Sequence, residues 1–575
     1  MEDKTIPLRD LAIIGDRRTC AYVSKNGSII WYCPRRFDYP SVFASLLDLV
    51  KGGSWKVLSK TLVFAEREYV SDSTVLKTHF TGSAGKLMIE DWMPMGAAFT
   101  GICRTLSVAP ESTVLRLTPK PDYARSEVNL VQKNNVISIN GQQFLYASHP
   151  ISIKDNTIEC NVPEGEASWF VLSDIQLEMT QEVIEQAKQQ TQKHWEEVSG
   201  HIKYHGPYEM EVRNSLRVLR LMTCAENGGI IAAGTTSLPE VLGGDRNYDY
   251  RYVWLRDASM IVSALTRAGS DGVEERKLLD FICGAMHEVD EPVVPFFTLG
   301  FTPAPGEEII NLAGYANSKP VRIGNDANNQ LQLDAISNVL LAAKLIYSTY
   351  DTREHWGVIS RLADFLALHW HKPDHGLWEE TEQKHYTSSK VVAAVSLEFI
   401  SQQTDDKAQK ERWLNAAKAI RDYVHKNCLT KDGAYAAYAG AEFVDVSAML
   451  FPTWAYTAAD APEMLKTIAV LERDYCQNNL FRRHLLEHGS SREGAFLAGT
   501  FWVAQYWVMR RDWDKFGKVM QAALRFMNDV GLMPEEGDPE TGAYLGNIPQ
   551  TFVHASLIGA VIDYKNARQQ EKDKK

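Results

Sequence analysis

Apolar and polar residues alternate along short stretches of the first 180 residues, and this period of two is typical of half-buried β-strands. In residues 158–162, Ile-Glu-Cys-Asn-Val, every second side chain is apolar. Residues 136–139, Val-Ile-Ser-Ile, are followed by Asn140-Gly141, which is a strong signal for a tight hairpin. The pattern predicts an antiparallel β-sandwich domain over residues 1–180.

The period changes to that of an α-helix after residue 180. Residues 181–204 are mostly polar and carry only a thin apolar stripe, which predicts a linker helix. Beyond it, amphipathic stretches recur through residues 205–575 and predict about twelve helices. These stretches lie at 208–225, 257–269, 275–288, 328–349, 355–371, 387–403, 408–427, 444–456, 461–475, 494–509, 512–529 and 550–565.

Twelve consecutive helices favour six helical hairpins that close into an (α/α)6 barrel over residues 205–575. An open superhelix of hairpins would show the same period, although the stretches lack the fixed repeat length of a regular solenoid. The predicted fold class is therefore α+β and multidomain, with an N-terminal antiparallel β-sandwich followed by an (α/α)6 barrel that forms the catalytic domain.

The chain has 575 residues and a formal net charge of −12. This length corresponds to roughly two to four domains. An acidic surface repels phosphate backbones, which argues against a nucleic-acid partner, whereas a neutral substrate fits the charge balance. No uncharged apolar run reaches the length of a membrane span, so no membrane partner is expected. A homo-oligomer is compatible with the sequence but is not indicated by it.

The eight cysteines are scattered and include no Cys-x-x-Cys pair, so we interpret them as inert thiols. The start of the chain, Met1-Glu-Asp-Lys-Thr, lacks the features of an export signal. Together these observations predict a cytoplasmic location. The 15 histidines form no His-Glu-x-x-His pattern, and no phosphate-binding loop is present in the sequence. Neither a catalytic metal nor a cofactor is therefore expected.

Residues 243–257 combine several aromatic rings with charged side chains. Tyr250 and Trp254 are among the rings, and Arg256 and Asp257 close the segment. Aromatic faces pack against the C–H surfaces of sugars, and charged groups bind hydroxyls in fixed directions. The composition is typical of a sugar site, although a structural salt-bridge cluster with aromatic packing would have the same composition.

Trp378 is followed at once by Glu379 and Glu380, after a Gly turn and before a predicted helix. A carboxyl group held against an indole loses water, and desolvation raises its pKa, as a general acid requires. A solvated acidic loop is the alternative interpretation of residues 374–382.

Residues 531–542 hold four acidic residues in a loop bounded by Pro and Gly. One of these carboxylates could activate a water molecule. The stretch from Asp538 to Gly542 has good turn chemistry. We therefore expect a turn there, with Glu535 facing the site.

These segments resemble glycoside hydrolase family 15, which comprises glucoamylases, glucodextranases and trehalases. The resemblance covers nearly the whole chain and is strongest in residues 235–258, which are close to the family's TTSLPE and RNWDYRYCWLRDA signature. The matching blocks lie at residues 14–43, 235–258, 320–334, 493–502 and 546–554.

The resemblance implies an inverting, exo-acting α-glucosidase of the glucoamylase type. Such an enzyme hydrolyses glucose from the non-reducing end of neutral α-linked gluco-oligosaccharides or disaccharides. Glu379 matches the family's general acid and Glu535 its general base, and inversion requires the two carboxyls to lie about 6.5–9.5 Å apart. The residues that match substrate contacts are Tyr250, Trp254, Arg256, Asp257, Trp378 and Glu380.

Departures from the family pattern concern the leaving-group side of the site. The Arg that follows the general acid in many bacterial members is missing from residues 378–382, and Pro534 stands where Ser or Ala is usual. A trehalase of the same family is therefore an alternative to the glucoamylase type. Two further alternatives are an inverting phosphorolysis and a non-catalytic sugar sensor or interaction module. The preferred linkage and chain length stay open.

Overall fold

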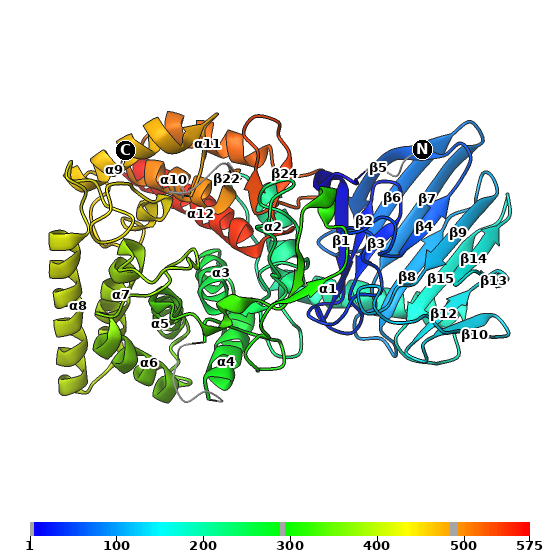
Figure 1. Cartoon of the computed structure of the whole chain (residues 1–575), viewed down its shortest axis with the longest axis horizontal. Coiled ribbons are helices and arrows are strands. Elements are labelled where there is room, and N and C mark those ends of the chain that lie inside the picture. Colours follow the sequence, from blue (N-terminus) through cyan, green and yellow to red (C-terminus); the bar gives the residue numbers. More distant parts are fainter. Residues whose placement is uncertain (1–4, 288–293, 484–492, 575) are drawn as a thin grey trace.

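The computed structural model describes residues 5–287, 294–483 and 493–574. The first four residues, on which the export-signal prediction rests in part, and residue 288, which ends one predicted helix, lie outside these ranges. A β-rich part formed by the N-terminal residues lies beside a helical part formed by the rest of the chain (Figure 1). The predicted fold class is confirmed, with a β-sandwich followed by an (α/α)6 barrel.

Fifteen strands form the β-rich part. They are β1 (Leu11–Gly15), β2 (Cys20–Ser24), β3 (Ile29–Tyr32), β4 (Ser54–Leu58), β5 (Val63–Tyr69), β6 (Leu76–Gly82), β7 (Gly85–Trp92), β8 (Gly101–Leu106), β9 (Thr113–Thr118), β10 (Leu130–Lys133), β11 (Val136–Ile139), β12 (Gln143–Ala147), β13 (Ile151–Lys154), β14 (Thr157–Val162) and β15 (Ser168–Ser173). A seven-stranded sheet has the order β1-β2-β3-β4-β9-β14-β13, and an eight-stranded sheet has the order β10-β11-β12-β15-β8-β7-β6-β5. All the pairs are antiparallel, and the core lies between the sheets, where Trp55 packs edge-on against Phe170.

The local sequence signals correspond to the observed strands. The predicted hairpin joins β11 to β12, and Asn140 and Gly141 have φ values of +52° and +68°, as a type I′ turn requires. In β14 the apolar residues Ile158, Cys160 and Val162 are buried, which confirms the period of two.

Helix α1 (Gln181–Gly200) follows the last strand of the sandwich, as predicted for the linker. The side chain of Thr180 accepts a hydrogen bond from the backbone N–H of Val183 and so caps the helix. Ile184 and Ala187 pack against the eight-stranded sheet around Trp92. The domain boundaries at residues 180 and 204 stay a prediction.

The helical part closes into a barrel. Its inner ring consists of α3 (Leu255–Arg267), α5 (Leu333–Tyr350), α7 (Thr387–Ile400), the short 3-10 helix η5 (Val446–Leu450), α10 (Leu497–Met509) and α12 (Thr551–Asp573). Each inner element contacts the next, and α12 contacts α3. This closure excludes the open superhelix.

The outer ring supplies one helix before each inner element along the chain. These helices are α2 (Glu209–Met222), α4 (Val273–His287), α6 (Trp356–His369), α8 (Lys407–Asn427), α9 (Pro462–Val470) and α11 (Trp513–Leu524). Inner and outer helices differ in pattern because they differ in burial. In α10 every residue from Leu497 to Val508 is buried, whereas α8 buries only a stripe that includes Trp413 and Ile420.

Short elements complete the described part of the chain. They are η1 (Leu8–Asp10), β16 (Val253–Trp254), β17 (Phe296–Phe297), β18 (Glu308–Ile310), η2 (Tyr315–Asn317), β19 (Val321–Ile323), η3 (Asp326–Asn329), η4 (Ser401–Gln403), η6 (Leu471–Tyr475), β20 (Cys476–Gln477), β21 (Leu480–Phe481), β22 (Ala495–Phe496), β23 (Glu536–Gly537) and β24 (Tyr544–Leu545). Most of the short strands lie in the loops at the ends of the helices, where they fix the loop backbone.

The sandwich contacts loops of the barrel through buried polar groups. The hydroxyl of Tyr22 donates to the carbonyl of Ile548 at 2.6 Å, and the indole N–H of Trp31 donates to the carbonyl of Gly234 at 2.9 Å. A hydrogen bond between buried groups is costly to leave unmade, so the sandwich helps to fix these two loops.

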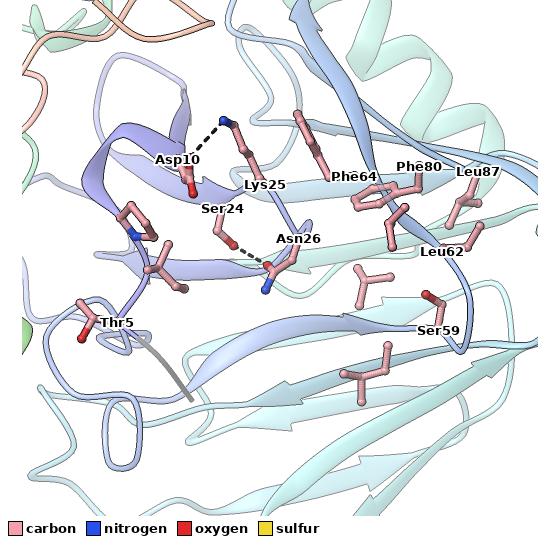
Figure 2. Close-up of a pocket in the computed structure, with 15 residues that line it drawn as sticks. Thr5, Asp10, Ser24, Lys25, Asn26, Ser59, Leu62, Phe64, Phe80 and Leu87 are labelled. Carbon is pink, nitrogen blue, oxygen red and sulfur yellow. Dashed lines mark hydrogen bonds and ion pairs between the residues drawn. The ribbon is translucent and has the colours of Figure 1, made fainter. Parts of the chain in front are cut away.

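An open cavity of about 1210 Å³, including space open to solvent, lies in the sandwich beside the β2–β3 turn (Figure 2). Phe64 and Phe80 form part of its apolar wall. At its rim Lys25 pairs with Asp10 at 3.0 Å. None of the predicted site residues lines this cavity.

All eight cysteines are free thiols, and seven of them are buried. Among the described residues, every helix is too short or too polar to cross a membrane.

Candidate active site

The predicted catalytic residues and all the predicted substrate contacts except Glu380 line one cavity. It lies at the end of the barrel where the inner helices begin, and it holds about 430 Å³, including space open to solvent. Its lining consists of Ala232, Tyr250, Trp254, Arg256, Asp257, Leu377, Trp378, Glu379, Arg483, Phe496, Glu535, Gln550 and Phe552.

The start of α3 brings three of these side chains to the cavity. Strand β16 ends at Trp254, and α3 begins at the next residue, so Arg256 and Asp257 lie in its first turn. The indole of Trp254 stacks on Phe296 of β17, with ring centroids 4.3 Å apart. Packing therefore holds this ring rigidly as one wall.

Arg256 and Asp257 form a buried pair. Nε of Arg256 donates to Oδ1 of Asp257 at 3.0 Å, and its Nη1 donates to Oε1 of Gln332 at 3.3 Å. A second carboxylate, that of Asp334, lies 3.6 Å from Nη1. Burial raises the pKa of Asp257 to about 6 although Arg256 acts in the opposite direction, and the pKa of Asp334 is raised to about 6 in the same way.

Glu379 lies in the left-handed backbone region, with φ at +60°. Such a conformation is uncommon for a residue with a side chain and is concentrated at functional sites. Nε1 of Trp254 donates to Oε1 of Glu379 at 2.5 Å, and Nη2 of Arg256 lies 3.4 Å from the same oxygen. The amide of Gln330 donates to its backbone carbonyl at 3.1 Å. Both of these side-chain contacts therefore go to the same oxygen, Oε1, of the carboxyl.

Glu535 is almost fully buried and lies directly before β23. The hydroxyl of Tyr250 donates to its Oε1 at 2.7 Å, and its backbone N–H donates to the carbonyl of Asn547 at 3.1 Å. A Cβ atom at Gly546 would lie 2.3 Å from Oε2 of Glu535, so a side chain there would displace the carboxyl. Glycine at this position keeps the space for it.

The electrostatic surroundings of Glu535 disfavour its charged form. Burial and the carboxylate of Glu240 raise the pKa of Glu535 to about 8, while Arg483 and the hydrogen bond from Tyr250 act in the opposite direction. The carboxyl can therefore exchange a proton near neutral pH.

Three buried carboxyls, of Glu240, Glu493 and Glu536, lie close enough together to surround one cation. Two guanidinium groups already occupy this region: Arg483 lies 2.5 Å from Glu240 and 2.8 Å from Glu493, and Arg246 lies at 2.8 and 2.5 Å from the same two carboxylates. Burial and the neighbouring carboxylates raise the pKa of Glu536 well above its usual value. This donor set is an ion-pair network rather than a metal site.

A larger outer cavity continues from the first one and shares Tyr250, Trp378, Glu379 and Arg483 with it. It holds about 1420 Å³, including space open to solvent. Glu380 lines this outer cavity together with Gln330, His375 and other polar residues. Glu379 therefore stands at the border between the two cavities.

Trp378 is fixed on several sides. Its Nε1 donates to Oδ2 of Asp445 at 2.6 Å. Its ring stacks on Trp502 at 5.8 Å and meets Phe496 edge-on at 4.9 Å. The indole thus forms a rigid surface that faces both cavities.

A model of the glycosyl hydrolases family 15 matches residues 208–519 and 514–562, which is more than half of the chain. The chain belongs to glycosyl hydrolase family 15. A model of a trehalase-like N-terminal domain matches residues 1–201. Family membership confirms the resemblance that the sequence blocks indicated.

Several relatives of this family-15 protein match over nearly their whole length. Trehalase 1 of Sulfolobus acidocaldarius is 31% identical, covering 97% of this chain and 99% of the relative. The trehalase of Thermoplasma volcanium is 28% identical, covering 95% of this chain and 91% of the relative. The trehalase of Mycobacterium tuberculosis is 27% identical, covering 98% of this chain and 90% of the relative.

The solved structure of a bacterial glucoamylase complexed with acarbose has the same fold as this family-15 chain. The TM-score is 0.71 at 14% sequence identity, and the match covers 99% of this chain and 96% of the other. At this identity the likeness establishes the fold alone.

The sequence of the family-15 chain did not single out every residue that builds the site. Arg483 and Asp445 carried no motif, and Gln332 and Asp334 stood out only as members of the block at residues 320–334 that resembles the family. Their roles emerge only because distant segments meet at one cavity. The catalytic roles of Glu379 and Glu535 remain predictions.

Proposed function

We propose that this protein is an inverting trehalase, which hydrolyses the α,α-1,1 bond of trehalose to two molecules of glucose. The observation that carries the proposal is the similarity to proteins named trehalase over nearly the whole of both chains. These relatives support the trehalase alternative better than the glucoamylase type that the sequence first favoured. A cytoplasmic location stays a prediction.

One glucose unit would occupy the inner cavity. Arg256 and Asp257 would bind its hydroxyls, because a buried guanidinium and carboxylate offer donors and acceptors in fixed directions. Tyr250 and Trp254 would form its aromatic walls. The carboxylate of Asp257 would also offset the positive charge that develops on the sugar ring in the transition state.

Glu379 would act as the general acid. Its place at the border of the two cavities fits the oxygen that links a sugar in the inner cavity to a leaving group in the outer one. As that bond breaks, the proton of the Glu379 carboxyl passes to the glycosidic oxygen, and the leaving glucose departs with an intact hydroxyl.

Glu535 would act as the general base. Ionised, it removes a proton from a water molecule whose oxygen attacks the anomeric carbon from the opposite face. The hydrogen bond from Tyr250 favours this ionised form, whereas burial opposes it. The proton balance closes because Glu535 gains one proton and Glu379 loses one.

The size of the outer cavity favours a second candidate. About 1420 Å³ outside the border residue could hold a leaving group longer than one glucose, as in a glucoamylase-type enzyme. The same substrate comparison tests both candidates.

The test is the value of kcat/KM for trehalose, maltose, isomaltose, kojibiose and soluble starch. We expect kcat/KM for trehalose to exceed that for each other sugar by at least about 10-fold. A site whose polar groups hydrogen-bond the hydroxyls of one leaving group leaves some of those groups without partners when a different leaving group is bound. A preference for maltose or starch would support the glucoamylase type instead.

Two variants test the assigned roles. Glu379→Gln and Glu535→Gln should each lower kcat/KM on the preferred substrate by about 100- to 10,000-fold. Glu382→Gln is the matched control, because Glu382 follows on the same loop with its side chain 76% exposed. Activity that survives Glu535→Gln unchanged would favour phosphorolysis, and a folded wild-type chain that cleaves none of these sugars would favour the non-catalytic alternative.

A further inference from the structure

We infer that the barrel holds a second sugar-binding cavity at the end opposite the family-15 site, and that its ligand is a neutral pyranose such as glucose. This cavity holds about 1160 Å³, including space open to solvent, and is formed by the inner helices and the segment after η5.

The two cavities occupy opposite ends of the barrel. On α3, Arg256 in the first turn lines the family-15 site, whereas Arg267 at the last position lines the second cavity. On α12, Phe552 lines the first site and Asp563 the second cavity, about three turns further along. The second cavity is therefore separate from the proposed catalytic residues.

The polar lining of the second cavity is preorganised. Arg267 and Asp563 form an ion pair between α3 and α12, and the amide of Gln505 donates to Oδ2 of Asp563 at 2.8 Å. The hydroxyl oxygen of Thr453 is buried without a hydrogen-bond partner among the described residues. These groups offer fixed donors and acceptors with balanced charge, which suits hydroxyls better than an ion.

Space and an aromatic surface accompany these polar groups. Trp454, which is half-buried, contributes its indole to the lining. Gly559 lies inside α12, where glycine costs about 1 kcal/mol relative to alanine. A Cβ atom there would lie 3.1 Å from Nε2 of Gln505, so glycine leaves room for that amide. An indole beside an amide and an ion pair is the chemistry that binds a pyranose ring.

One charged group departs from this balance. The ammonium of Lys344 lies over the ring of Phe399, 5.4 Å from its centroid. If this charge dominated recognition, a phosphorylated sugar would bind better than a neutral one. Glucose 6-phosphate is therefore the comparison ligand for the test.

The two sites share a wall. Trp502 lines the second cavity and donates from Nε1 to the hydroxyl of Ser556 at 3.0 Å, while its ring stacks on Trp378 of the family-15 site. A ligand in the second cavity would thus contact a residue that supports the proposed catalytic site. Glucose is chosen as the probe because it is the product of the proposed reaction, and only this choice rests on the proposed function.

The test is equilibrium dialysis of the full chain with radiolabelled glucose. We expect wild-type protein to bind one equivalent of glucose in the second cavity, in addition to any glucose bound at the family-15 site. Trp454→Ala should weaken binding in the second cavity by at least 10-fold. Gly559→Ala is the second variant and should do the same, because its Cβ would lie 3.1 Å from Nε2 of Gln505 and push that amide aside. Trp513→Ala, at a half-buried tryptophan on outer helix α11, is the control that should bind glucose as the wild type does.

Several results would overturn the inference. They are no binding of glucose to the wild type, glucose binding that neither cavity variant weakens, and tighter binding of glucose 6-phosphate than of glucose. Failure of the proposed function gives a different result from failure of this inference. In that case the protein would release no glucose from trehalose, but dialysis would still show glucose bound in the second cavity.

Discussion

The hydroxyl of Tyr250 donates a hydrogen bond to Oε1 of Glu535 at 2.7 Å, inside the cavity that also contains Glu379. A donor of this kind stabilises the ionised carboxylate more than the protonated one. Burial and Glu240 act in the other direction and raise the pKa of Glu535 to about 8. The protonation of the proposed base is thus set by a few named contacts, and each can be removed singly.

Tyr250→Phe removes that donor, so the pKa of Glu535 should rise further. A base must be ionised to work, and the acid limb of the pH profile of kcat/KM should therefore move to higher pH, by about one unit for a bond worth about 1.5 kcal/mol. Tyr252→Phe, two residues away, removes a hydroxyl that does not bond Glu535 and should leave the limb in place. An acid limb that stays fixed or moves to lower pH in Tyr250→Phe would contradict the assignment of Glu535.

At the scale of elements, the loop that carries Tyr250 and Trp254 is fixed by Arg251, which is 1% exposed. Nε and Nη2 of Arg251 donate to the two oxygens of Asp249 at 2.8 and 2.6 Å. Nη1 reaches into the sandwich and donates to the hydroxyl of Tyr123 at 2.8 Å. The sandwich therefore helps to hold the loop from which the aromatic walls and α3 begin.

Arg251→Ala leaves the carboxylate of Asp249 buried without its partner, and we expect the free energy of unfolding to fall by about 3–5 kcal/mol. Tyr123→Phe removes two hydrogen bonds, the one from Arg251 and the one to the carbonyl of Tyr39, and should cost about 2 kcal/mol. Arg125→Ala breaks two exposed ion pairs, with Asp122 and Glu308, and should cost no more than about 1 kcal/mol. Urea denaturation measures all three. Equal losses for Arg251→Ala and Arg125→Ala would contradict the role given to the buried pair.

At the scale of the whole molecule, most of the fold follows from local patterns. The twelve predicted stretches correspond to eleven helices and η5 in the described residues, because each barrel helix must present an apolar surface to its neighbours. The predicted boundaries of the helices were less accurate than the helices themselves. The prediction of a helix from residue 328 was wrong at its start, since residues 326–329 form η3 and α5 begins only at Leu333.

The site was predictable only in part. Glu379 and Glu535 stand in loops of unusual composition, and the family resemblance named them. Arg483 and Asp445 contact the site through tertiary packing, and no spacing of residues in the nearby sequence predicts such a contact. Helical periodicity alone favoured a closed barrel without excluding an open superhelix, because closure depends on α12 meeting α3 some 300 residues away in the chain.

The most direct test of the central claim follows the anomers of glucose by NMR during the first minutes of trehalose hydrolysis. Water inverts the anomeric carbon that it attacks, so that glucose unit is released as β-glucose. The other unit leaves with its α configuration unchanged, and we therefore predict equal initial amounts of β- and α-glucose. In water enriched in oxygen-18, the label should enter the β-anomer. Initial release of α-glucose alone would mean retention, and it would contradict the roles proposed for Glu379 and Glu535.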